Sequence, residues 1–309
     1  MLPDSKVSFT TAEAVPLATA MVAYEARVAG IKCLIIKGPA AVKAGLRDRR
    51  PSADVDVLVE PSRFSEYLAI FEAKGWQRRY DYPTHPTIVD PHSVTLIHPD
   101  WPCDLDVHSA WPGFFVKPKV AFDLLWQDHE TAKMAGQKID VPAWPHHALI
   151  MTLHSLRTPS SAGPARDYEI VLGALRHKAT LPGYLDGFCD SVIELGATET
   201  AGPLLNALGK GDLVPTTRSK AYIAWELQAK SALLKGVGWN LRLRAVPVLK
   251  RPAVMWKAVF PPVESLATTF PQLVGSPLWL LRAWARRLVR GVGDLQEVNQ
   301  AIDRVTHEN

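Results

Sequence analysis

The stretch DVDVLV, residues 54–59, constrains most strongly what this chain can fold into. Asp54 and Asp56 alternate there with apolar residues, and a period of two predicts a β-strand. Both carboxylates then project from one face of the strand, where like charges held close together repel. If the strand lies at a solvated edge of the sheet, the two acids have no functional role. If other functional residues converge on them, the two acids are part of a site.

The segments around this strand predict an α/β (α+β) fold with a mixed sheet. A helix is expected over 11–29 and another from Pro39. Strands are expected at 31–36, 54–60, 76–80, 93–98 and 103–108, and a further helix between Ser62 and Gly75. The last two strands flank the short connection PDWP, which favours a hairpin. We therefore predict an N-terminal mixed-sheet domain over residues 1–120.

The remainder, residues 121–309, is predicted to be a mostly helical region that forms a cleft and binds the acceptor. The first helical segment is expected over 120–134 (VAFDLLWQDHETAKM). Near the C-terminus, a helix at 276–291 carries Trp279 and Trp284 among arginines 282, 286, 287 and 290. This helix would either contact RNA, an acidic peptide or a membrane surface, or turn its tryptophans toward a core.

Composition sets broad limits on the class of protein. Of 309 residues, 47% are hydrophobic and 21% charged, which is typical of a folded chain. The net charge of +4 neither requires nor excludes nucleic acid. The three cysteines lack metal-ligand or disulfide spacing, and no signal peptide or membrane-spanning run is expected. These features predict a cytoplasmic protein, and they leave the oligomeric state open.

Two further motifs supply chemistry that the acid pair lacks. In CDLDVH, residues 103–108, Asp104, Asp106 and His108 share one face of a strand. In IIKGPAA, Lys37 and Gly38 form a turn before a helix N-terminus, an arrangement typical of phosphate sites. Carboxylates that converge from neighbouring strands need a cation among them, and oxygen ligands suit Mg²⁺ or Mn²⁺. The sequence therefore predicts a metal-dependent nucleotide site.

The order KGPA, then RxxxDxDVLV (50–59), then DVH (106–108) resembles the nucleotidyltransferase superfamily with the polymerase-β-type fold. More narrowly, it is similar to bacterial nucleotidyltransferase-like proteins often associated with modified-peptide biosynthesis clusters. The resemblance covers residues 30–110 and continues loosely through 145–175. It departs from the wider superfamily at Lys37, where a small polar residue is usual.

This resemblance implies a role for each matching residue. Asp54 and Asp56 would be the first two metal ligands, and Asp106 the third carboxylate, which helps to activate the acceptor hydroxyl. Asp104 competes with Asp106 for that position. The predicted nucleotide-binding residues are Lys37, Gly38, Arg50 and His108.

The implied reaction transfers a nucleotidyl group from a nucleoside triphosphate, such as ATP or GTP, to an acceptor hydroxyl. The acceptor would be a peptide, an RNA or a small molecule, with Mg²⁺ or Mn²⁺ as cofactor and pyrophosphate as product. Two alternatives stay open: a non-catalytic nucleotide sensor or scaffold, and a kinase-like phosphoryl transferase.

Several supporting residues also allow two interpretations. Arg50, within the cluster RDRR (47–50), would either reach the triphosphate or anchor the acidic strand by a bidentate contact. His147, His154 and Asp167 would either line the cleft or join helices to one another.

Overall fold

The computed structural model describes residues 9–79, 92–157, 162–231 and 246–253, with scattered positions between 256 and 289. Contacts divide the chain into two compact units. The first comprises Met1–Arg79 with His92–Thr216, and the second comprises Tyr80–Pro91 with Thr217–Asn309. All the predicted site residues belong to the first unit.

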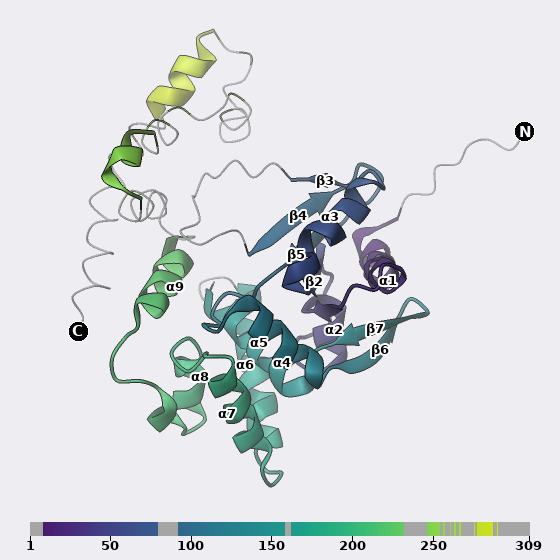
Figure 1. Cartoon of the computed structure of the whole chain (residues 1–309), viewed down its shortest axis with the longest axis vertical. Coiled ribbons are helices and arrows are strands. Elements are labelled where there is room, and N and C mark those ends of the chain that lie inside the picture. The colour runs from purple at the N-terminus through teal and green to yellow at the C-terminus, as the bar shows by residue number, and fades with distance from the viewer. Residues whose placement is uncertain are drawn as a thin grey trace, which may run out of the picture. The chain divides into compact units, whose positions relative to one another are not determined.

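The order of elements in the first unit confirms the predicted alternation of helices and strands, followed by helices (Figure 1). The elements are α1 (Thr11–Val28), β1 (Cys33–Ile36), α2 (Gly38–Lys43), β2 (Asp54–Val59), the 3₁₀ turn η1 (Pro61–Arg63), α3 (Phe64–Glu72), β3 (Gln77–Arg78), β4 (Ser93–Ile97), β5 (Asp104–His108), α4 (Pro118–Gln127), β6 (Glu130–Met134), β7 (Gln137–Val141), α5 (Trp144–Arg157), α6 (Ala162–Lys178), α7 (Tyr184–Glu194), α8 (Gly202–Ala207) and η2 (Gly211–Leu213). The second unit contains α9 (Lys220–Ser231) and η3 (Val248–Lys250).

The main sheet is mixed, as predicted. Its strand order is β1-β2-β5-β4-β3, in which only the β2–β5 pair is parallel among the described strands. Strands β4 and β5 pair antiparallel across the PDWP connection, which confirms the predicted hairpin. The parallel pair sets β2 and β5 side by side at the centre of the sheet, although they are far apart in the sequence. This adjacency brings the two acidic motifs together.

Alternation along the strands gives the sheet two apolar faces, and different helices cover each face. Val55 and Val57 on β2 and Leu105 on β5 pack with α1 and α3 in one core cluster. Leu34 and Leu58 belong to the other cluster, which is built largely from α4 to α8. Because Asp56 shares the face of Leu58, the acids lie on the side covered by the later helices.

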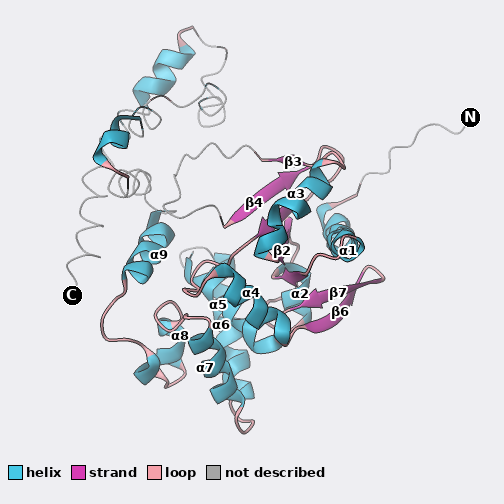
Figure 2. Ribbon diagram, viewed as in Figure 1, coloured by secondary structure: helices cyan, strands magenta, loops and turns pink. Residues whose placement is uncertain are grey.

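The predicted helix over 120–134 is wrong in its second half. Helix α4 ends at Gln127, and residues 130–134 form strand β6, which pairs with β7 in a separate hairpin (Figure 2). The connecting residues Ala135 and Gly136 both have positive φ, at 43° and 79°. Such a two-residue turn matches the twist of an antiparallel pair, and it overrides the weak helical pattern of ETAKM.

In the second unit, the tryptophans of the C-terminal segment pack inward. Trp279 and Trp284 contact a small buried cluster of Leu266 and Ala283. Arg282 and Arg286 are exposed, whereas Arg287 and Arg290 lie outside the described residues. Within the part of the chain that the structure describes, none of the helices has the length and apolarity needed to cross a membrane.

Because both faces of the sheet are buried, truncating a side chain on a central strand should lower the free energy of unfolding. Leu105 on β5 is fully buried, so Leu105→Ala removes apolar contacts and leaves a cavity. We expect a loss of about 2–5 kcal/mol in the free energy of unfolding, measured by urea denaturation. Val120→Ala, at an exposed position of α4, is the matched control and should change stability by less than about 0.5 kcal/mol. Equal effects of the two substitutions would contradict this description of the core.

Candidate active site

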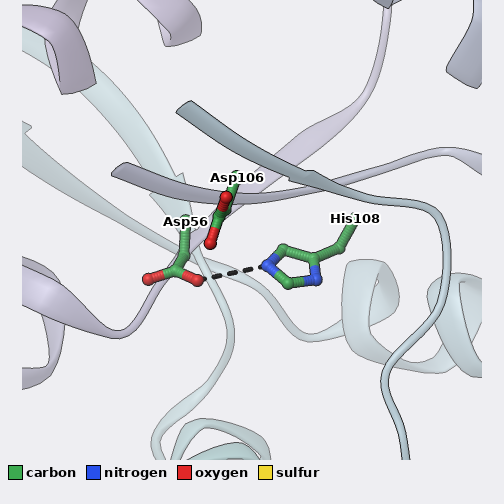
Figure 3. Close-up of side chains that lie close together, drawn as sticks. All are labelled: Asp56, Asp106 and His108. Atoms are coloured by element: carbon green, nitrogen blue, oxygen red, sulfur yellow. Dashed lines mark hydrogen bonds and ion pairs between the residues drawn. The ribbon is translucent and has the colours of Figure 1, made fainter. Parts of the chain in front are cut away.

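The parallel register of β2 and β5 sets the acids of the two motifs directly opposite one another. Asp54 pairs with Asp104, and Asp56 pairs with Asp106. Asp56, Asp106 and His108 form a group whose potential ligand atoms all lie within 4.8 Å of one another (Figure 3). Asp54 falls outside this group. Two adjacent strands therefore bring the Asp56 carboxylate together with the Asp106 carboxylate and the His108 imidazole, which lie about fifty residues later in the chain.

Asp56 is the most deeply buried acid of the site. Its Oδ1 atom accepts from the Lys37 ammonium at 2.6 Å and lies 3.1 Å from His108 Nε2. Burial by itself would raise the pKa of Asp56, but Lys37 and His108 outweigh it and hold this pKa well below its usual range. Asp56 is therefore a carboxylate that the protein keeps ionised.

Asp106 and Asp104 differ in their partners, although both lie on β5. Thr95 on β4 donates its hydroxyl to Asp106 Oδ1 at 2.6 Å, which orients this carboxylate beside Asp56. Asp104 instead forms an ion pair with Arg79 at 2.6 Å. Of the two candidates for the third acid, Asp106 is the one grouped with Asp56 and His108.

Asp54 lacks a hydrogen-bond or ion-pair partner among the residues that the structure describes. Burial and the neighbouring Asp56 charge raise its pKa from 3.8 to about 6. An unpartnered, crowded carboxylate of this kind would be stabilised by a further cation, so the donor set fits a divalent metal ion.

The turn between β1 and α2 has a strained backbone beside the acids. Lys37 adopts φ 56°, which is rare for a residue with a side chain, and Gly38 has φ 42°. The Lys37 N–H donates to Nε2 of His147 on α5 at 3.1 Å, and its ammonium lies 5.9 Å from the centre of the Trp111 ring. Helix α5 therefore holds this turn through His147, and the Lys37–Asp56 pair ties it to β2.

Arg50 is engaged by acids rather than left free. Its NH1 and NH2 groups donate to the two oxygens of Asp167 on α6 at 2.7 and 2.6 Å. Arg50 also pairs with Asp48, which in turn pairs with Arg166. This is the bidentate contact considered for Arg50 from the sequence, but it joins the loop before β2 to α6.

The structure thus brings together Lys37, Asp56, Asp106 and His108, with Asp54 and Gly38 adjacent to them in the chain. Thr95 and Trp111 also contact the site, although neither was predicted from the sequence. For Thr95 the sequence carried a signal, because the polar residues Ser93 and Thr95 alternate along β4. Thr95 pairs with Asp106 on β5. No local pattern marked Trp111, which approaches the site only through the fold.

The Arg50–Asp167 contact predicts a structural cost when it is broken. Asp167→Asn keeps the shape of the buried side chain but removes the bidentate countercharge of the Arg50 guanidinium, which keeps only its pair with Asp48. We expect the free energy of unfolding to fall by about 2–3 kcal/mol in urea titrations. Arg166→Gln, which breaks the exposed pair with Asp48, is the control and should cost less than about 1 kcal/mol. An Asp167→Asn protein as stable as the wild type would contradict this role.

The buried His147 predicts a dependence of stability on pH. Burial lowers its pKa from 6.5 to about 4, so between these values the unfolded chain binds a proton that the folded chain does not. The contribution of His147 is complete above pH 6.5 and is lost as the pH falls toward 4, at about 1.4 kcal/mol per pH unit.

His147→Gln keeps a hydrogen-bond acceptor but removes this titration. Its unfolding free energy, measured by urea denaturation between pH 7 and 4.5, should fall less steeply than that of the wild type. His177→Gln, at an exposed histidine of α6, is the matched control. Parallel profiles for the His147→Gln variant and the wild type would contradict the prediction.

Two solved structures resemble the chain at low similarity. A nucleotidyltransferase-like antigenic protein from Paracoccidioides brasiliensis has 14% identity and a TM-score of 0.37, with 63% of this chain and 93% of that chain covered. The lincosamide antibiotic adenylyltransferase LnuA, bound to lincomycin, has 12% identity and a TM-score of 0.35, with 50% and 94% covered. No curated protein matches the chain with significance.

A family model described as "uncharacterised nucleotidyltransferase" matches residues 11–163. The matched range contains the whole five-stranded sheet, helix α5 and every residue of the acid group. This part of the chain therefore belongs to that nucleotidyltransferase family.

Proposed function

We propose that this protein is a metal-dependent nucleotidyltransferase that moves a nucleotidyl group from a nucleoside triphosphate to an acceptor hydroxyl and releases pyrophosphate. One observation supports this most directly. Asp56 and Asp106 stand in register on parallel strands, and one oxygen of each and one nitrogen of His108 all lie within 4.8 Å of one another. Family membership supplies the class of reaction.

Asp54, Asp56 and Asp106 would hold Mg²⁺ or Mn²⁺, because their oxygens are the ligands these ions prefer. When bound, the metal offsets the charge of the acids and of the phosphates. Lys37 and His108 keep Asp56 ionised, and we propose that they act on the nucleotide mainly through this acid. Arg50 positions the start of β2 through Asp167, and Gly38 allows the chain to turn next to the phosphates.

Asp106, oriented by Thr95, is suited to accept the proton of the acceptor hydroxyl. The acceptor oxygen then forms a bond to the α-phosphorus, the bond from this phosphorus to the β-phosphate oxygen breaks, and its electron pair leaves with pyrophosphate. Placement of the third acid on a strand that is hydrogen-bonded along its length makes this geometry rigid.

The pairing of β5 with its neighbours predicts opposite outcomes for its two acids. Asp106→Asn and Asp56→Asn should each weaken Mn²⁺ binding, measured by calorimetry, and lower nucleotidyl transfer by about 100-fold or more. Asp104→Asn, on the same strand but paired with Arg79, is the matched control and should retain both properties. Loss of both properties in Asp104→Asn, with retention in Asp106→Asn, would reverse the assignment.

The reaction itself is tested by incubating the protein with each of the four α-³²P-labelled triphosphates, Mn²⁺ or Mg²⁺, and a lysate of its native host. Label transferred to a peptide, an RNA or a small molecule identifies both base and acceptor. Added mass equal to a phosphate rather than a nucleotide would show a kinase-like reaction. Binding of triphosphate without any transfer would favour a nucleotide sensor and contradict our proposal.

A further inference from the structure

Among the residues that the structure describes, two arginines near the acid group lack an acidic partner, unlike Lys37 and Arg50. Lys37 is paired with Asp56, and Arg50 with Asp167. Arg157, the last residue of α5, makes no hydrogen bond or ion pair with the residues that the structure describes. Arg47 donates to the Ser52 hydroxyl at 2.8 Å, but its buried Nε atom has no hydrogen-bond partner in the described part of the chain. A shielded charge without a countercharge costs free energy, so its retention points to a ligand.

Arg47 lies at the strained turn. The hydroxyl oxygen of Ser52, which accepts from Arg47, is 3.4 Å from the position that a Cβ atom on Gly38 would take. Burial and the neighbouring Arg50 lower the pKa of Arg47, whereas Asp167, Asp54 and Asp56 act in the opposite direction. The guanidinium of Arg47 is therefore close both to the glycine bend and to the acids of β2.

Arg157 reaches the same region from helix α5. This helix contacts the turn through His147, and His154 follows about two turns later on the same helical face. Burial lowers the pKa of His154 to about 3, and its other electrostatic neighbours include Lys37, Asp56, Arg157 and Arg47. His154 is therefore close enough to interact electrostatically with Asp56 and with the guanidinium groups of Arg47 and Arg157.

Arg157 also interacts electrostatically with His92, which immediately precedes β4. Its charge contributes to the lowered pKa of His92, after burial. The ring of His92 stacks on that of His108, with 6.2 Å between ring centres, and His108 bonds to Asp56. Arg157 and Arg47 thus approach the acid group from two different elements, α5 and the loop before β2.

We infer that Arg47 and Arg157 form the binding site for the polyphosphate tail of the triphosphate, the part that leaves as pyrophosphate. This inference rests on the proposed function. Guanidinium groups match phosphate oxygens in a bidentate geometry and remain charged when shielded from water. The acids and a metal ion would then face the α-phosphate, while the two arginines offset the charge on the departing phosphates.

An unpaired arginine kept for a ligand has a signature that a structural arginine lacks. Replacement of Arg157 by Gln removes a charge that has no partner among the described residues, so folding should not suffer. We expect the melting temperature of Arg157→Gln to equal or exceed that of the wild type. A structural arginine would instead lower the melting temperature when replaced.

The test uses inorganic tripolyphosphate with Mg²⁺ as a probe that has no base or ribose, together with the four nucleoside triphosphates. Calorimetry on the full chain should show tripolyphosphate binding that Arg47→Gln and Arg157→Gln each weaken by about 10- to 100-fold. Arg157→Lys, which keeps the positive charge but not the bidentate geometry of the guanidinium, should retain part of the affinity. Arg49→Gln is the matched control, because Arg49 is exposed on the same loop as Arg47.

Each outcome separates this inference from the proposed function. Tripolyphosphate binding unchanged in both glutamine variants, alongside normal nucleotidyl transfer, overturns the arginine site and leaves the function standing. A lower melting temperature in Arg157→Gln with unchanged binding assigns that residue a structural role and also overturns the inference. Arginine-dependent polyphosphate binding without nucleotidyl transfer supports the site and rejects the transferase reaction.

Discussion

The contact between the Lys37 ammonium and Asp56 is the constraint on which the architecture of this site depends. Lys37 Nζ and Asp56 Oδ1 lie 2.6 Å apart, and only 2% of the Asp56 side chain is exposed. An ionised carboxylate buried to this extent is stable only with a countercharge and hydrogen bonds. Lys37 at the end of β1 and His108 at the end of β5 provide them. Three strands must therefore stand in one register for the central strand to keep its acid.

The ion pairs around this contact divide into two kinds with different consequences. The Arg50–Asp167 pair satisfies both of its members and ties the approach to β2 onto α6. The charges of Asp54, Arg47 and Arg157 have no opposite partner among the described residues. A fold gains nothing from shielding such groups, whereas a ligand that carries a metal ion and phosphates would satisfy acid and arginines together. The unbalanced charges thus mark the side on which a ligand would bind.

Local patterns were sufficient for much of the fold because they report directly on burial. Alternation identified β2 and β5 and the faces on which their acids lie, and apolar spacing identified α1. The hairpin β6–β7 was missed because its strands are short and mostly exposed. A positive-φ turn at Ala135 and Gly136 decides its conformation, and periodicity does not detect such a turn.

The sequence by itself determined that Asp54 and Asp56 share one face of their strand and that Asp106 and His108 share one face of theirs. It also determined that Lys37 precedes a bend. These are properties of neighbouring residues and follow from the geometry of an extended chain. Tertiary structure alone decided that β2 lies parallel to β5, that Asp104 turns to Arg79 while Asp106 joins Asp56, and that α5 brings His147 to Lys37. Partners distant in sequence are chosen by packing of the whole domain, because the energy of a buried charge depends on everything that surrounds it.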